Sequence, residues 1–184
     1  MTNLVRQNTT VMKKYPSIKT ILILIVTLLL FACVNERKEI EFKPVDWQER
    51  TIEFEVNEKY QSGSSYLSVY SEIFDHSDEM KHLLTATVSI RNTSFTDSLF
   101  ILTADYYNTN GEAIRSYVEL PVFLTPLETI EIVIPRLDIA GGSGANFIFD
   151  WAIHKGKHEP IFEAVMVWTT GNQGISFVTH GRKL

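Results

Sequence analysis

Residues 145–153 read Ala-Asn-Phe-Ile-Phe-Asp-Trp-Ala-Ile, and this stretch decides the fold class. Side chains alternate between the two faces of an extended strand, so every second residue shares a face. The residues on one face here are Ala145, Phe147, Phe149, Trp151 and Ile153. A face made only of apolar and aromatic side chains predicts a strand that borders a hydrophobic core.

The same two-residue period recurs along the chain, with turn residues between the periodic stretches. We expect residues 99–107 and 161–169 to be central strands, because both are apolar on both faces for part of their length. Asn110-Gly111 predicts a hairpin turn between two of the strands. Strands are expected at residues 52–56, 66–73, 84–91, 99–107, 112–118, 130–134, 145–153, 161–169 and 174–180.

No stretch beyond the N-terminal apolar run has the 3.6-residue period of an amphipathic helix. Many short strands separated by turn signals are typical of antiparallel sandwiches and barrels. The sequence therefore predicts an all-β, antiparallel, immunoglobulin-like β-sandwich of about nine short strands. A signal-peptide helix is expected to precede it.

The N-terminal segment has the layout of a secretory signal peptide, in which basic residues precede an apolar run. The run at residues 21–31 is 11 residues long, whereas a membrane-spanning helix needs about 20. Residues 1–32 are therefore predicted to be a signal peptide. Met12 is an alternative start, because Met12-Lys13-Lys14 opens such segments.

Cys33 is the only cysteine of the chain and ends this apolar run. Leu30-Phe31-Ala32-Cys33 resembles the lipobox of bacterial lipoproteins, in which the cysteine thiol receives a diacylglycerol and becomes the first mature residue. The resemblance implies lipidation at Cys33, and two or three acyl chains give stable membrane attachment. It also favours the outer membrane where there are two, because Val34 rather than an aspartate follows. An intact signal-anchor helix and a buried free thiol are the alternatives.

Residues 33–46 are predicted to be the lipidated cysteine with a charged tether, and residues 47–184 a single β-sandwich domain. After residue 32 the chain has 13 Lys and Arg against 22 Asp and Glu. An acidic domain does not attract a phosphate backbone, which argues against nucleic-acid binding. A single cysteine excludes a scaffold held by disulfides.

The most distinctive loop contains Gly141, Gly142, Ser143 and Gly144 and leads to Asn146. It is our candidate functional loop, with two interpretations. The loop either turns tightly, with the Asn146 side chain bonding its backbone groups, or it presents amides to a ligand. Ser143 is the basis of a hydrolase alternative, although a nucleophile elbow needs a helix after the serine and a strand is expected here.

Three other sets of residues are candidate sites or contacts. Residues 75–82 collect carboxylates and imidazoles, including Asp75, His76 and His82, and are the basis of a metal-binding alternative; their spacing matches no calcium loop. Asp105 and Arg115 are predicted to form a structural ion pair across the Asn110-Gly111 hairpin. Trp168 and Tyr106 could lie on an outer face and bind a flat ligand such as a sugar.

Several short motifs occur in a fixed order between Tyr66 and Arg182. Together they resemble the uncharacterised bacterial domain-of-unknown-function family 3124, whose members are mostly exported or lipid-anchored. The resemblance implies an envelope location and assigns no reaction or catalytic residue. The motifs are Ser89-Ile90-Arg91-Asn92-Thr93, Asp105-Tyr106-Tyr107, Arg115-Ser116-Tyr117, Gly141-Gly142-Ser143-Gly144-Ala145-Asn146-Phe147, Glu163-Ala164-Val165-Met166 and Gln173-Gly174-Ile175-Ser176-Phe177.

These observations predict a membrane-tethered envelope lipoprotein with a non-enzymatic binding or structural role. We expect a monomer that binds an envelope protein or polysaccharide. Its globular part is expected to lie outside the cytoplasm. No cofactor, metal or catalytic residue is predicted. An envelope hydrolase using Ser143 and a metal-binding module using residues 75–82 are the alternatives.

Overall fold

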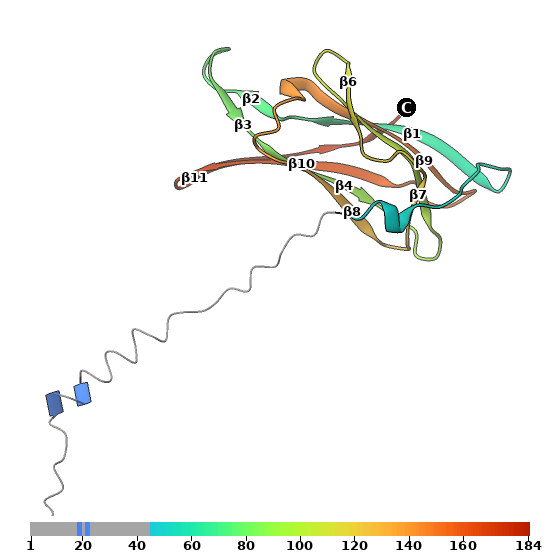
Figure 1. Ribbon diagram of the computed structural model, residues 1–184, viewed down its shortest axis with the longest axis horizontal. Helices are drawn as coiled ribbons and strands as arrows, with labels where there is room; N and C mark the ends of the chain where they lie inside the picture. Colours follow the sequence, from blue (N-terminus) through green and yellow to red (C-terminus); the bar gives the residue numbers. More distant parts are fainter. Residues whose placement is uncertain (1–17, 20, 23–44) are drawn as a thin grey trace, which may run out of the picture. The chain divides into compact units, whose positions relative to one another are not determined.

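The computed structural model describes residues 18, 19, 21, 22 and 45–184 (Figure 1). The first four of these residues are helical and exposed. Across the described ranges, no helix combines the length and apolar character needed to cross a membrane. The predicted lipidation site Cys33, and the tether as far as residue 44, lie outside the described residues.

Residues 45–184 form antiparallel strands and two short 3-10 turns. The 3-10 turns are η1 (Gln48–Arg50) and η2 (Gly142–Gly144). The strands are β1 (Tyr60–Val69), β2 (Glu72–Phe74), β3 (Lys81–Leu83), β4 (Thr85–Arg91), β5 (Leu99–Tyr107), β6 (Ala113–Ser116), β7 (Val122–Leu124), β8 (Thr129–Ile134), β9 (Ala145–His154), β10 (Ile161–Thr170), β11 (Gln173–His180) and β12 (Arg182–Lys183).

The strands form three sheets. A six-stranded sheet has the order β12-β1-β9-β5-β6, and β7 also pairs with β5. A four-stranded sheet has the order β11-β10-β4-β8, and β2 with β3 forms a separate two-stranded sheet. The prediction of an all-β antiparallel domain is confirmed. Strands β5 and β10 have neighbours on both sides, which confirms the interior position expected for residues 99–107 and 161–169.

The inner residues of the two large sheets form one buried hydrophobic cluster. Phe147 and Phe149 on β9 are fully buried, and Trp151 is 1% exposed, so the aromatic row belongs to the core as predicted. Phe149 stacks on Phe162 of the four-stranded sheet, with 4.4 Å between the ring centroids. The indole N–H of Trp151 donates to Ser65 Oγ at 2.9 Å, which satisfies its buried polar atom.

The strand expected at residues 52–56 is absent from the described fold. Outside the named strands this segment makes a single bridge, between Thr51 and Val122, and the N–H of Ile52 donates to Pro121 O at 2.9 Å. Phe54 instead stacks on Phe100, with the centroids 4.1 Å apart. In this irregular segment Ile52 and Phe54 are half-buried, whereas Glu53, Glu55 and Val56 are exposed.

The β domain has two ends, which position its loops. Strand β1 runs from Tyr60, opposite His154, to Val69, opposite Ala145. At the first end, which we name the Tyr60 end, are the connections at residues 92–98, 125–128 and 155–160. At the other, the Val69 end, are the β2–β3 hairpin, the glycine loop and the β10–β11 turn; Figure 1 shows β2, β3 and the tip of β11 on the same side of the domain.

Candidate functional site

The backbone of the glycine loop is hydrogen-bonded to neighbouring segments at the Val69 end. The N–H and the hydroxyl of Thr109 both donate to Gly141 O at 3.0 Å. The Thr109 hydroxyl also accepts from the Gly144 N–H at 2.9 Å, and the Ser71 N–H donates to Gly142 O at 3.0 Å. These backbone groups are therefore occupied by the protein itself.

Two of the glycines are required by their surroundings. A Cβ at Gly141 would lie 2.0 Å from the hydroxyl of Tyr106 and 2.8 Å from Ser71 Oγ. Gly142 has φ 71°, a left-handed conformation that favours glycine. The close contacts support the tight-turn interpretation over the interpretation in which loop amides bind a ligand.

Ser143 and Asn146 do not take the roles considered for them. Ser143 lies in η2, and the strand β9 follows at once, so the helix that an elbow requires is replaced by a strand. Among the described residues, no hydrogen bond joins its hydroxyl to a histidine or a carboxylate. Asn146 is the second residue of β9, opposite Ser68, and it is the Thr109 hydroxyl that bonds the loop backbone.

The predicted ion pair between Asp105 and Arg115 is wrong. Asp105 lies opposite Ser116, and Arg115 opposite Tyr106, so the two charged side chains point to opposite faces of the sheet. Arg115 instead pairs with Asp138, with 3.0 Å between Nη2 and Oδ2.

Arg115 and Tyr106 each form a hydrogen bond with another side chain, and both have a shifted pKa. Arg115 Nη1 donates to the Tyr117 hydroxyl at 2.7 Å, and this bond raises the pKa of the guanidinium above its ordinary value. Burial raises the pKa of the Tyr106 hydroxyl, and its bond with Ser71 Oγ at 3.0 Å opposes that effect. The hydroxyl of Tyr106 therefore stays protonated and serves to connect β5 with the segment before β2.

A cleft of about 560 Å³ lies between two hairpins at the Val69 end. We call it the hairpin cleft. The β2–β3 hairpin contributes three polar side chains, and the β10–β11 hairpin contributes an aromatic ring, two amides and an aliphatic side chain. The lining residues are Asp75, His76, His82, Trp168, Asn172, Gln173, Gly174 and Ile175.

The imidazole and the indole of the hairpin cleft contact one another. The rings of His82 and Trp168 have centroids 4.1 Å apart and planes inclined by 39°. Asp75 holds both histidines of its hairpin, with 2.6 Å from Oδ1 to His76 Nδ1 and 3.3 Å from Oδ2 to His82 Nε2. The arrangement fixes the His82 ring against Trp168 and joins the two hairpins.

The metal-binding alternative finds no support in this geometry. Each imidazole nitrogen that faces Asp75 is directed at one of its carboxylate oxygens. Within the described part of the chain, no group of three or more His, Cys, Asp or Glu residues could hold a metal ion. The three side chains therefore bond to one another instead of converging on an ion.

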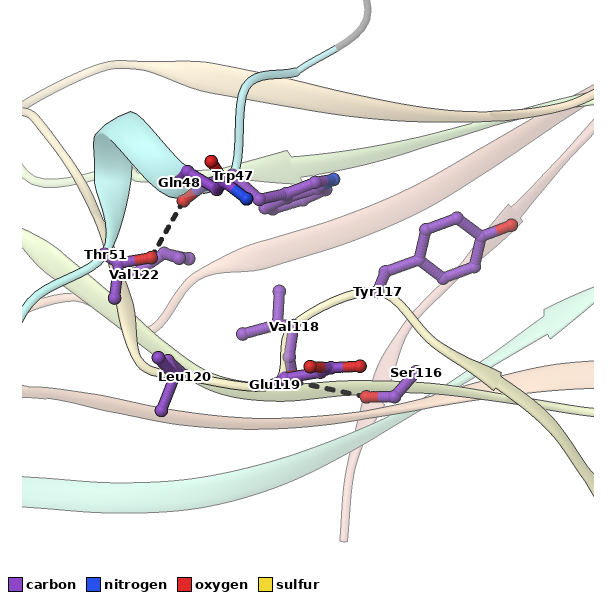
Figure 2. Close-up of a pocket in the computed structure, with 9 residues that line it drawn as sticks. All are labelled: Trp47, Gln48, Thr51, Ser116, Tyr117, Val118, Glu119, Leu120 and Val122. Atoms are coloured by element: carbon purple, nitrogen blue, oxygen red, sulfur yellow. Dashed lines mark hydrogen bonds between the residues drawn. The ribbon is translucent and has the colours of Figure 1, made fainter.

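A second hollow, of about 250 Å³, lies between the η1 segment and the chain that connects β6 with β7. Figure 2 shows the ring of Trp47 above Val118, with the ring of Tyr117 to the right of both. Its walls are braced by bonds from Thr51 Oγ1 to Trp47 O at 3.0 Å and from Ser116 Oγ to Val118 O at 3.2 Å.

The sequence identified parts of the hairpin cleft without joining them. Residues 75–82 and Trp168 were separate candidates, because some 90 positions divide them along the chain. The sequence analysis assigned no binding role to the amides of Asn172 and Gln173. Their convergence follows from the pairing of β10 with β11 and of β2 with β3, which the sequence pattern did not predict in full.

The comparisons with known proteins agree with the family resemblance. No curated protein matches the sequence. A solved structure described as "Crystal Structure of Thermotoga maritima 1070" is similar at 9% identity, with a TM-score of 0.42 over 65% of this chain and 92% of that chain. Residues 62–184, which contain the glycine loop and the hairpin cleft, match the family described as "Protein of unknown function (DUF3124)". The chain belongs to this family.

Proposed function

We propose that the chain is a lipid-anchored protein of the bacterial cell envelope, and that its β domain is a non-enzymatic module that binds an envelope polysaccharide in the hairpin cleft. The observation that carries the binding role is the convergence of His82 and Trp168 with polar side chains from two hairpins. The anchor is Cys33, which follows a basic and apolar leader.

The proposed organisation is a signal peptide at residues 1–32, a lipidated cysteine and tether at 33–46, and one domain at 47–184. Within the domain we propose an immunoglobulin-like sandwich. The shared cluster of the two large sheets and the stacking of Phe149 on Phe162 support it. Nuclear Overhauser contacts between these two rings would test it, and their absence would contradict the packing of the sheets.

The chemistry of the hairpin cleft suits a sugar. A pyranose ring has an apolar face of C–H groups and a rim of hydroxyls, so its sites combine aromatic rings with planar hydrogen-bonding side chains. Trp168 supplies the ring, and Asn172 and Gln173 supply amides that both donate and accept. The Asp75 carboxylate adds an acceptor that is 24% exposed.

Fractionation of cells tests the anchor. Cys33→Ser is expected to abolish both the incorporation of a labelled fatty acid and the recovery of the protein with membranes. Ala32→Ser, a small-for-small change beside the cysteine, is the matched control and should keep both. Membrane recovery of Cys33→Ser without the fatty-acid label would favour the signal-anchor alternative.

Sedimentation with purified peptidoglycan tests the ligand. Trp168→Ala is expected to weaken binding roughly tenfold, which corresponds to about 1.4 kcal/mol. Because Trp168 also packs against the core, Asn172→Ala at the exposed turn provides a variant without that structural role. Phe95→Ala, an exposed aromatic at the Tyr60 end, is the control. Equal binding by all the variants, or none by the unsubstituted protein, would contradict the polysaccharide proposal.

A further inference from the structure

We infer that the Tyr60 end of the domain lies on a lipid bilayer, with Phe95 and Leu127 in contact with the lipid. This inference rests on the lipid anchor proposed above and adds the orientation of the domain. Phe95 is 77% exposed and Leu127 is 58% exposed. The two side chains come from different connections, residues 92–98 and 125–128, that meet at this end.

The connection that carries Phe95 is held rigid from inside. The buried side chain of Asn92 donates through Nδ2 to the carbonyls of Asp97 at 2.9 Å, Leu124 at 3.2 Å and Thr125 at 2.9 Å. One buried amide thus joins the two connections. An exposed phenylalanine on a loop of fixed shape contacts a surface without a further loss of backbone entropy.

Leu127 occupies a backbone conformation that disfavours its side chain. Its φ is 60°, and it is the one non-glycine residue with positive φ in the described part of the chain. Its N–H donates at 3.0 Å to Ser94 O, in the peptide bond that precedes Phe95. Glycine or asparagine suits this conformation better. An exposed leucine here is strained in the fold and gains nothing from burial, which points to a contact outside the domain.

The carboxylates beside the two apolar side chains are neutralised. Each of the two connections carries one, Asp97 or Glu128. Lys157 Nζ lies 2.8 Å from Asp97 Oδ2, and Arg50 Nη2 lies 2.7 Å from Glu128 Oε1. The neighbouring β9–β10 connection adds Lys155 and Glu159, and Glu159 pairs with Lys183. The carboxylates of these three connections are therefore each paired with a cation, and Lys155 adds a positive charge that favours anionic lipid.

The path of the chain is consistent with this orientation. The continuous described range begins at Val45, and η1 is bound beside Leu127 through the pair of Arg50 with Glu128. The 12 residues from Cys33 to Val45 span at most about 40 Å when fully extended. An acylated Cys33 therefore keeps the domain close to the bilayer. With the Tyr60 end on the lipid, the hairpin cleft at the Val69 end faces away from it.

Fluorescent labelling of the full chain in vesicles tests the orientation. The variants are Phe95→Cys, Leu127→Cys and, as the control, Leu137→Cys, which is 83% exposed on the connection after β8 at the Val69 end. Acylated protein is reconstituted into vesicles of phosphatidylethanolamine and phosphatidylglycerol and labelled with an environment-sensitive thiol dye. Acylation consumes the thiol of Cys33, so only the new cysteine reacts.

We expect the labels at 95 and 127 to emit at shorter wavelength than the label at 137. Aqueous iodide should quench them severalfold less, and lipids brominated in the acyl chain should quench them more. Equal iodide quenching at all three positions would overturn the orientation while leaving the anchor intact. Protection at 95 and 127 in native membranes but not in lipid vesicles would overturn it in favour of a protein partner. Labelling of the unsubstituted chain at Cys33 would overturn the anchor, and the orientation with it.

Discussion

The hydroxyl of Tyr106 occupies the space that a side chain at residue 141 would need. A Cβ built on Gly141 would lie 2.0 Å from that oxygen and 2.7 Å from the Cβ of Ala145. The loop therefore passes against β5 at a separation that only glycine allows. Glycine is required at residue 141 by this close approach and at residue 142 by its positive φ.

Gly141→Ala is expected to lower the free energy of unfolding by about 1–3 kcal/mol, as overpacking of a filled interior does. Urea denaturation measures the loss. Gly144→Ala is the matched control, because its Cβ would meet a Thr109 methyl group at 3.3 Å and needs only a small shift. Adding Tyr106→Phe should restore part of the stability. A Gly141→Ala protein as stable as the wild type would show that the loop relaxes freely.

Trp151→Ala is expected to cost about 3–5 kcal/mol, because it removes a large side chain from the core and leaves Ser65 without its partner. Trp151→Phe keeps an aromatic ring and loses the hydrogen bond to Ser65, so about 1 kcal/mol of the loss should appear there. Thermal unfolding followed by circular dichroism separates the two variants. Equal stability of Trp151→Ala and wild type would place the indole outside the core.

The sequence predicted the long strands well because each is long enough for the two-residue alternation to repeat several times. Residues 99–107 coincide with β5, and the row from Ala145 to Ile153 lies within β9. Strands β2, β3, β7 and β12 have two or three residues and show no period. They form because the tertiary structure brings a partner strand alongside, as β5 does for β7. Two of these short strands, β2 and β3, form the hairpin that builds one wall of the hairpin cleft.

The sequence pattern also did not determine the register of the strands, that is, which residue of β5 lies opposite which residue of β6. The Asn110-Gly111 hairpin is present, but among the described residues of this turn only Gly111 has positive φ. The pairing of β5 with β6 then shifts between Tyr106 and Tyr107. A one-residue error in register moves a side chain to the other face of a sheet. That is why Arg115 pairs with Asp138 and not with Asp105.

Acid should loosen the attachment of the N-terminal segment through Glu128. Burial raises the pKa of this carboxyl, but bonds from Arg50 and Thr125 outweigh it and hold the pKa below its ordinary value of 4.5. Because the pKa of Glu128 is lower in the folded state, its ionised carboxylate stabilises the fold at pH values above 4.5. The stabilisation is lost as the pH falls through the folded value. We expect up to about 1 kcal/mol from this partly exposed pair.

Glu128→Gln should therefore flatten the fall in melting temperature below about pH 4.5. Glu131→Gln, on the exposed face of β8, is the control and should follow the wild-type curve. Melting curves between neutral and acid pH measure the difference. If the melting temperature of Glu128→Gln falls in acid as steeply as that of the wild type, the loss of stability belongs to other carboxylates.

Leu127→Asn should make the protein more stable. The turn Thr125-Pro126-Leu127-Glu128 is closed by a bond from the Glu128 N–H to Thr125 O at 3.1 Å, and its third residue needs a positive φ. The left-handed conformation costs a leucine about 1–2 kcal/mol, and asparagine adopts it more readily. Because the side chain is exposed, no core contact is lost, and we expect a gain of about 1 kcal/mol in urea denaturation. Phe95→Ser, a polar change at an exposed position, should lie within about 0.5 kcal/mol of wild type.

If Leu127 contacts the membrane, the same Leu127→Asn protein should show weaker contact of its Tyr60 end with lipid. A variant that is less stable than wild type would mean that Leu127 supports the fold, and the strain would then give no reason to look for a contact outside it.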